Sequence, residues 1–168
     1  MSLLPLTDRP YMPDYGVVAE DEGSGLLPWS WAEDQLRSSA NFWLATRWPD
    51  GRPHVMPVWA AFDGEALWVS GGLHSRKVQN LLVEPRCVLT TEEARNPLVV
   101  EGVAEQVGED AAKQDYLQLV NHKYGTDYQL DFLDPATTAV FSVRPVWAFA
   151  LLESDFSGSP TRWRFSTS

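Results

Sequence analysis

The sequence predicts a mainly β (α+β) fold: an antiparallel barrel of six or seven short strands with a few peripheral helices. Short runs rich in aromatic and β-branched residues recur along most of the chain, and turns containing glycine or proline separate them. Helical periodicity is confined to a few stretches, without the regular strand–helix alternation of a parallel sheet. A length of 168 residues suits one domain with a substantial core.

The first half of the chain predicts an arm, a helix and three strands. Residues 1–28 hold four prolines and no sustained periodicity, so we expect an extended N-terminal arm followed by a single domain over residues 29–168. Ser30 and Glu33 have capping-box spacing, which predicts a short helix running to about Ala40. The runs "NFWLATRW" and "HVMPVWAAF" flank the turn "PDGRP" and predict a β-hairpin. A second turn, "DG" at 63–64, leads to a third strand, "ALWVS".

The second half continues with helices at the corners of further strands. The segment "GLHSRKVQNLL" predicts a helix from Ser75 that stops near Pro85. Strands are expected at "RCVLTTE" and "PLVVEGVAEQV", followed by a helix from about Glu109 to Tyr124 that Gly125 ends. After a short helical or irregular piece, we expect strands at "TTAVFSV" and "VWAFALLE", and then the terminal segment "TRWRF".

Composition excludes several classes of function. The formal net charge of -10 argues against a general nucleic-acid or anionic-membrane partner. The N-terminus does not resemble a secretory signal and no apolar run reaches spanning length, so we expect a cytoplasmic protein. Cys87 is the only cysteine and lies in an apolar stretch, which predicts a buried small hydrophobe. The three histidines lack metal-ligand spacing, so no metal is expected. Hydrolase, P-loop and dinucleotide-fold motifs are also absent.

Arg76 and Lys77 stand in the first turn of the predicted helix, where the helix dipole disfavours positive charge. A bound phosphate would offset this charge, since backbone N–H groups, the Ser75 hydroxyl and two long cationic side chains could converge on it. The alternative is that both cations are solvated and that Ser75 is an ordinary N-cap. The eight tryptophans indicate either aromatic packing or contacts with a planar ligand.

The order of these features resembles the pyridoxamine-phosphate-oxidase-like flavin-binding split-barrel superfamily, which also includes deazaflavin-dependent oxidoreductases. The resemblance runs from about Trp31 to Val107, through "WLATRWPDGRPHVMPVW", "ALWVSGGLHSRKVQNL" and "EPRCVLTTEEARNPLVVEGVAEQV". It continues more weakly through "NHKYG" and "TRWRF". It implies a split β-barrel and a homodimer with two FMN sites at the subunit interface.

The resemblance also implies the cofactor-binding residues. The cofactor phosphate would be held by Ser75, Arg76 and Lys77. A bound phosphate would explain why two cations stand at the start of this helix. By the same resemblance, further residues would contact the cofactor. His54, Met56, Pro57 and Trp59 match the strand beside the flavin ring, and Ser70 matches the strand that enters the phosphate loop. Thr91 and Glu92 match a segment of the cofactor pocket, and Trp163 and Arg164 match a C-terminal segment that closes the site. Flavin chemistry needs no side-chain nucleophile, so no catalytic residue is assigned.

Two departures from the family pattern bear on the reaction and on the choice of cofactor. The chain has no histidine after His122, whereas pyridoxamine-phosphate oxidases end in an Arg-x-His pattern; this argues against vitamin B6 oxidation. Gln79 stands where deazaflavin-binding relatives often carry a basic residue for the acidic coenzyme tail, which favours FMN. We therefore expect an FMN-dependent oxidoreductase that transfers two electrons, as hydride, to or from a small substrate. The alternatives are a reductase using the deazaflavin coenzyme F420 and a non-catalytic protein that binds flavin or haem.

Overall fold

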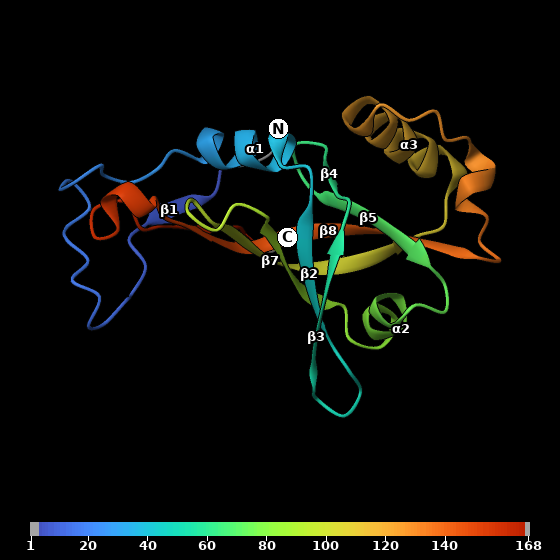
Figure 1. The fold of residues 1–168 in the computed structure, drawn as a ribbon, viewed down its shortest axis with the longest axis horizontal. Helices are drawn as coiled ribbons and strands as arrows, with labels where there is room; N and C mark the ends of the chain where they lie inside the picture. The colour runs from blue at the N-terminus through green and yellow to red at the C-terminus, as the bar shows by residue number, and fades with distance from the viewer. Residues whose placement is uncertain (1–3, 167–168) are drawn as a thin grey trace.

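The computed structural model describes residues 4–166; the first three residues of the predicted arm and residues 167–168 lie outside it. It confirms a mainly β fold, an antiparallel sheet with helices at its periphery (Figure 1). Within the described residues the strands number nine rather than six or seven. They are β1 (Leu6–Asp8), β2 (Phe42–Arg47), β3 (Pro53–Val58), β4 (Ala61–Phe62), β5 (Leu67–Gly72), β6 (Arg86–Thr91), β7 (Leu98–Val107), β8 (Thr138–Ala150) and β9 (Thr161–Arg164).

The strands follow the order β1-β9-β8-β7-β6-β2-β3, and every pairing is antiparallel. The sheet divides at β8, whose residues 138–143 pair with β5 while residues 147–150 pair with β9. Strand β5 also pairs with the short β4. The predicted hairpin is β2–β3, in which Phe42 faces Val58 and Arg47 faces Pro53.

Strand β8 corrects the prediction of two separate strands, because it runs without a break through Arg144 and Pro145. The register with β7 shifts there, so that Glu101 pairs with Trp147 and Gly102 with Pro145. A bulge is a site where a strand tolerates proline, which cannot donate to the ladder. A side chain at Gly102 would meet the Arg144 carbonyl oxygen at 2.6 Å, so glycine is required opposite the bulge.

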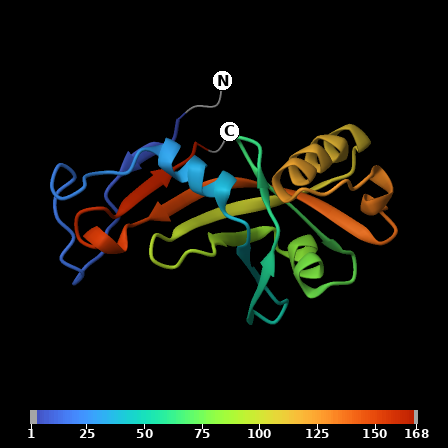
Figure 2. The same ribbon diagram turned by 45° about the horizontal axis from the view of Figure 1, so that its top comes forward.

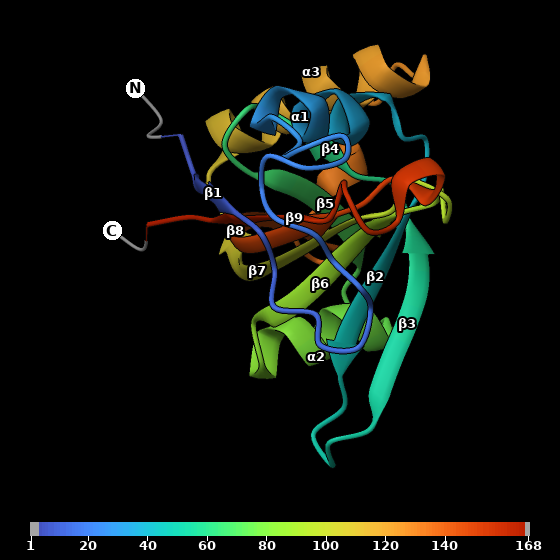
Figure 3. The same cartoon turned by 90° about the vertical axis from the view of Figure 1, so that its left-hand side faces the viewer.

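Three α-helices lie among the described residues: α1 (Trp29–Ser38), α2 (Arg76–Val83) and α3 (Asp110–Tyr124). Figures 1 and 3 show α1 and α3 on one side of the sheet and α2 on the other, beside β2 and β3. The bounds of α2 and α3 agree with the sequence, and Gly125 ends α3 in the left-handed conformation (φ 65°). Two short 3-10 helices, η1 (Leu130–Leu133) and η2 (Glu153–Asp155), complete the chain.

The predicted capping box at Ser30 is wrong. Helix α1 begins one residue earlier, at Trp29, with Pro28 at the N-cap position and no side-chain cap. Burial decides this start: Trp29 packs edge-on against the rings of Trp163 and Phe165, at centroid distances of 5.5 and 5.0 Å. The main core holds Trp29 and the inward-facing residues of the sheet, together with Ala32 and Leu36 of α1 and Val78 and Leu81 of α2. Cys87 belongs to this core, as predicted, and burial raises the pKa of its thiol to about 12.

The corner between β3 and β4 is fixed by the end of α3, where the sequence reads "NHKYG". The Tyr124 hydroxyl accepts a hydrogen bond from the Ala60 N–H at 3.1 Å, and it lies 2.9 Å from the Ala40 carbonyl oxygen. The Lys123 ammonium donates to the carbonyl oxygens of Leu36 and Ala60, at 3.2 and 2.8 Å. Partial burial lowers the pKa of Lys123 to about 8. This segment therefore serves the fold by satisfying irregular backbone groups.

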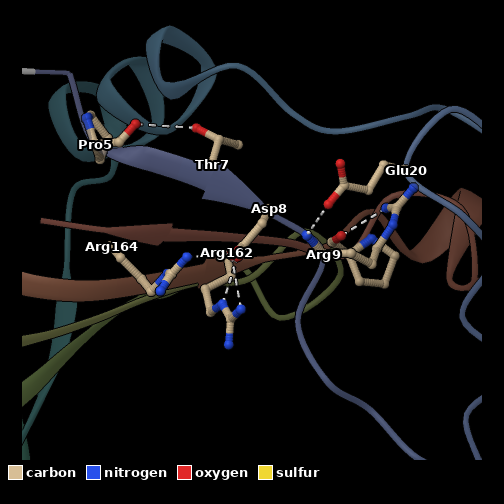
Figure 4. A network of polar contacts seen from close by, with 8 residues as sticks. Pro5, Thr7, Asp8, Arg9, Glu20, Arg162 and Arg164 are labelled. Carbon is tan, nitrogen blue, oxygen red and sulfur yellow. Dashed lines mark hydrogen bonds and ion pairs between the residues drawn. The ribbon is translucent and has the colours of Figure 1, made fainter.

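The N-terminal arm returns to the sheet and adds the edge strand β1 beside β9 (Figure 2). Figure 4 shows Asp8 between Arg162 and Arg164. The Asp8 carboxylate accepts hydrogen bonds from Arg162 Nε at 2.7 Å, Arg162 Nη2 at 2.9 Å and Arg164 Nη2 at 2.7 Å. The guanidinium of Arg9 donates to the carbonyl oxygens of Gly158 and Pro160, at 3.0 and 2.7 Å. The arm is thus attached to the C-terminal part of the chain by charge-assisted hydrogen bonds.

Candidate functional site

The start of α2 gathers Ser75, Arg76 and Lys77. Ser75 occupies the N-cap position in extended conformation, yet its hydroxyl makes no capping hydrogen bond. The Ser75 Oγ and Arg76 Nε atoms are both buried, and neither has a hydrogen-bond partner among residues 4–166. Because buried polar groups are normally satisfied, these two atoms fit an external hydrogen-bonding ligand. Ser75 is therefore not an ordinary N-cap serine.

Lys77 and the preceding loop are held by close packing and by the loop's own hydrogen bonds. A Cβ atom at Gly71 would lie 2.8 Å from Lys77 Cε and 3.4 Å from its Nζ, so the glycine lets this lysine cross β5. The Gln79 amide donates to the Leu73 carbonyl oxygen at 2.8 Å, and the Leu73 N–H donates to the Thr137 carbonyl oxygen at 2.8 Å. Gln79 thus fixes the loop that leads to Ser75.

The β2–β3 hairpin extends beside α2 (Figure 1), and the side chain of Trp48 at its tip contacts Arg76. The guanidinium carbon of Arg76 lies 3.8 Å from the ring centroid of Trp48, and that of Arg52 lies 4.5 Å from the same ring. Both distances are in the range of cation–π contacts. The Trp48 ring also meets the His54 ring edge-on, with centroids 6.2 Å apart. The hairpin tip and the first turn of α2 therefore form one site.

A chain of side-chain hydrogen bonds joins α2 to the hairpin beneath this site. Asn80 Nδ2 donates to Thr46 Oγ1 at 3.0 Å, and Thr46 Oγ1 lies 3.4 Å from His54 Nδ1. The Thr46 hydroxyl thus links the Asn80 amide to the His54 ring. Asn80 is fully buried, and its Oδ1 has no partner among the described residues. Of the predicted strand residues, His54 is thus brought into the site.

The other predicted residues of this strand are partly exposed. Met56 is 44% exposed, on the same side of β3 as His54, whereas Pro57 points to the opposite side, beside Trp43. Trp59 is also 44% exposed, and it stacks on Tyr124 with centroids 4.2 Å apart. Strand β3 is an edge strand, and most of its residues are exposed, so a planar ring could lie along it.

Ser70, Thr91 and Glu92 have partners within the protein. The Ser70 hydroxyl accepts a hydrogen bond from the Tyr116 hydroxyl at 3.0 Å, on the side of β5 that faces α3. Thr91 is buried, and its Oγ1 accepts the Leu98 N–H at 3.1 Å. Glu92 accepts the backbone N–H groups of Ala40 and Asn41, each at 3.2 Å, and the amide of Asn41 at 3.0 Å. Within one chain the structure does not bring these three to the start of α2.

Trp163 and Arg164 lie on β9, separated from β2 by β8, β7 and β6. Trp163 is fully buried in the main core. Arg164 has a half-exposed side chain that is bound to Asp8. A cofactor at α2 of the same chain is therefore not adjacent to either residue.

Charge distribution distinguishes Arg76 and Lys77 from their basic neighbours. Arg47 and Arg86 both pair with Glu84, at 3.4 and 2.6 Å, and hydrogen bonds from Arg86 lower the pKa of Glu84 to about 2. In residues 4–166, no carboxylate lies within ion-pair distance of Arg76 or Lys77. Their positive charges remain available, together with the dipole of α2, for an external anion.

Sequence reasoning missed Trp48, Thr46 and Asn80. Trp48 ends the run "NFWLATRW" and reads as a strand residue, while Thr46 and Asn80 are separated by 34 residues and meet only in the folded chain. No group of three or more potential metal ligands occurs in the part of the chain that the structure describes. No helix there is long and apolar enough to cross a membrane.

The fold and this site together define a split-barrel protein in which the positively charged start of a helix lies beside an open strand. The sequence matches the family described as pyridoxamine 5'-phosphate oxidase over residues 32–152. The chain belongs to this family, as the resemblance predicted. No curated protein matches the sequence significantly.

Solved structures resemble the chain at modest sequence identity. An F420 reductase is 28% identical and has a TM-score of 0.58, with 69% of this chain and 94% of that chain covered. The haem storage protein HutZ from Vibrio cholerae is 20% identical, with a TM-score of 0.59 and coverages of 69% and 88%. The conserved hypothetical protein Rv2991 from Mycobacterium tuberculosis is 23% identical, with a TM-score of 0.62 and coverages of 92% and 90%. The latter two likenesses concern the fold alone.

Proposed function

We propose that the protein is an FMN-binding oxidoreductase that transfers two electrons, as hydride, to or from a small substrate. The observation that carries this proposal is the pair of buried, unpartnered atoms at α2, Ser75 Oγ and Arg76 Nε. A phosphate monoester accepts hydrogen bonds on several oxygens and carries negative charge, which suits these donors and the free charge of Lys77. Membership of the pyridoxamine 5'-phosphate oxidase family supports a flavin phosphate as this anion.

The residues of the chain would bind and orient the cofactor. Ser75, Arg76 and Lys77 would hold the phosphate, while the open strand β3 would lie beside the ring. His54 lies on the same side of β3 as Met56, and its ring is held by the Thr46 hydroxyl. A bound flavin would supply the two-electron chemistry, and the protein would supply position, electrostatics and exclusion of water.

We also propose that the protein is a homodimer. On the outward face of the sheet, one paired row runs from strand to strand and is apolar except for a threonine: Pro57, Trp43, Thr90, Val99 and Phe149. Trp43 and Val55 on this face are 48% and 50% exposed. A contiguous exposed apolar face is typical of an interaction surface, and a second copy of the chain offers the same face in return.

The oligomeric state can be tested by light scattering after size-exclusion chromatography. The wild type should elute as a dimer, and Trp43→Asp should shift it to a monomer. Phe132→Asp provides a control, because Phe132 is similarly exposed, at 46%, but lies on η1. A monomeric wild type, or equal dissociation by both substitutions, would contradict the proposal.

A reductase using the deazaflavin coenzyme F420 is the second candidate, favoured by the 28% identity to an F420 reductase. Against it, Gln79 carries no charge and its amide is bound to Leu73, while Arg47 and Arg86 are paired with Glu84. Few free cations therefore remain near the site for an acidic coenzyme tail. A non-catalytic flavin- or haem-binding protein is the third candidate, and the fold of HutZ is compatible with it.

The first experiment is to purify the protein from a host that makes FMN, F420 and haem, and to identify the released chromophore by absorption and mass. FMN supports the main proposal, whereas F420 or haem would replace the cofactor named here. Steady-state turnover with candidate electron acceptors then separates an enzyme from a binding protein.

Substitutions test the residues themselves. Arg76→Ala with Lys77→Ala should abolish FMN retention, while riboflavin, which lacks the phosphate, should bind the variant and the wild type equally. Arg95→Ala is the control, because Arg95 is an exposed cation whose guanidinium pairs with Glu153 at 3.8 Å. Undiminished FMN affinity in the double variant would exclude the phosphate assignment.

A further inference from the structure

Trp48 is held on a closed turn at the tip of the β2–β3 hairpin. Its N–H donates to the Arg52 carbonyl oxygen at 2.9 Å, and its own carbonyl oxygen accepts the Gly51 N–H at 2.9 Å. Gly51 has a φ of 92°, which side-chain-bearing residues rarely adopt, so the turn depends on this glycine. The backbone at Trp48 is thus fixed by the hairpin turn itself.

The way Arg76 is held differs from the way other arginines of this chain are held. Arg162 donates hydrogen bonds to the carboxylate of Asp8, and Arg86 donates to that of Glu84. In both arginines some N–H donors are occupied and the charge is partly neutralised. Arg76 instead has its guanidinium 3.8 Å from the Trp48 ring centroid. An aromatic ring attracts the cation through the π face, while the N–H donors lie in the guanidinium plane and point outward. Stacking therefore fixes Arg76 without neutralising it.

Arg52 has a different role on the same ring. Its guanidinium carbon lies 4.5 Å from the Trp48 centroid, but its Nε donates to Asp50 Oδ2 at 2.8 Å. Asp50 thus takes up one donor and part of the charge of Arg52, whereas Arg76 has no carboxylate partner among the described residues.

We propose that Trp48 is a positioning residue for phosphate binding: it orients the Arg76 guanidinium so that its donors face the phosphate. The inference rests on the proposed function, and it extends the site to the tip of the hairpin. It also makes the hairpin sensitive to occupancy, since an anion that fixes Arg76 also fixes the ring stacked on it.

The test compares FMN with riboflavin in variants of Trp48. Trp48→Ala should weaken FMN binding about five- to thirtyfold, the loss expected from a partly desolvated cation–π contact, and should leave riboflavin binding unchanged. Trp48→Phe, which keeps an aromatic face, should restore most of the FMN affinity, and Trp48→Leu, which keeps only apolar bulk, should not. Arg95→Ala, at an exposed arginine that pairs with Glu153 and not with the hairpin, is the control, with FMN affinity within about twofold of the wild type.

A second readout does not depend on flavin. The Arg76 Nε–H resonance, followed by NMR, should shift when inorganic phosphate is added to the wild type and should shift less in Trp48→Leu. If the wild type binds no flavin, the cofactor assignment fails, and this titration alone decides the role of Trp48. The inference is overturned if Trp48→Ala and Trp48→Leu bind FMN like the wild type, if they lose FMN and riboflavin equally, or if phosphate leaves the Arg76 signal unmoved.

Discussion

Gly71 and Gly72 are adjacent glycines at the end of β5, but a methyl group would have different effects at the two positions. A Cβ at Gly71 would lie 2.8 Å from Lys77 Cε and 3.1 Å from Val78 Cγ2. At Gly72 the nearest heavy atom would be the Thr137 carbonyl oxygen, at 4.0 Å. Both glycines have φ values that alanine can adopt. Gly71→Ala therefore displaces the Lys77 side chain, and Gly72→Ala is its matched control.

The size of the effect follows from what Lys77 contributes. A hydrogen bond between charged groups is worth about 1.5–3 kcal/mol, and a displaced but still flexible lysine would lose part of it. We expect Gly71→Ala to weaken FMN binding by about 1–2 kcal/mol, or roughly five- to thirtyfold. The stability of the apoprotein should fall by less than about 1 kcal/mol, because the end of a lysine can move and Val78 must shift by only a few tenths of an ångström.

Isothermal titration of each apoprotein with FMN and with riboflavin measures this effect, and urea denaturation measures stability. Gly72→Ala should bind FMN like the wild type. The reasoning is refuted if both alanine variants lose FMN affinity equally, since that would indicate a general effect on the loop. It is also refuted if Gly71→Ala binds FMN as tightly as the wild type, because Lys77 would then not be a phosphate ligand.

Two further predictions concern the C-terminal strand. Asp8→Asn should release the arm and make it sensitive to limited proteolysis at neutral pH. Hydrogen bonding to Arg162 lowers the pKa of Asp8. In the wild type the arm should therefore be fully attached above the ordinary pKa of an aspartate, and it should be released as the pH falls through the lowered pKa of Asp8. An arm that remains resistant in Asp8→Asn would show that Arg9 alone holds it. Trp163→Ala should reduce the free energy of unfolding by about 3–5 kcal/mol in urea, because Trp163 is fully buried, whereas Trp163→Phe should keep FMN affinity. Loss of FMN affinity without loss of stability in the phenylalanine variant would place Trp163 at the cofactor.

The sequence was most informative where structure is local. The β2–β3 hairpin needs only the turn "PDGRP" and two flanking runs, and α3 needs its apolar spacing and Gly125. The continuity of β8 could not be predicted, because proline reads as a break unless the bulge opposite Gly102 is known. The start of α1 was misjudged for a similar reason, since the burial of Trp29 against distant aromatic residues outweighs a local capping pattern.

The same distinction holds for the site. Arg76 and Lys77 stand out in the sequence because their charge conflicts with their position in a helix. Trp48 and Asn80 carry no such conflict, and their contacts with Arg76 and Thr46 join segments far apart in the chain. The resemblance placed Trp163 at the C-terminal closure of the site, but alternation in β9 turns its side chain into the core. Whether a tryptophan faces a core or a ligand depends on pairing that a single sequence does not display.

The pairing of β1 with β9 also has a consequence for folding. Leu6 pairs with Arg164 in this ladder, so the two paired strands are far apart in the sequence. The hydrogen bonds from Arg9 to Gly158 and Pro160 join equally distant segments. During synthesis β1 emerges first but has no partner until β9 is made. Such distant contacts carry the largest loop-closure cost and form late, after the hairpin and the helices are in place. Weakening the arm should therefore accelerate unfolding and leave the rate of folding of the barrel nearly unchanged.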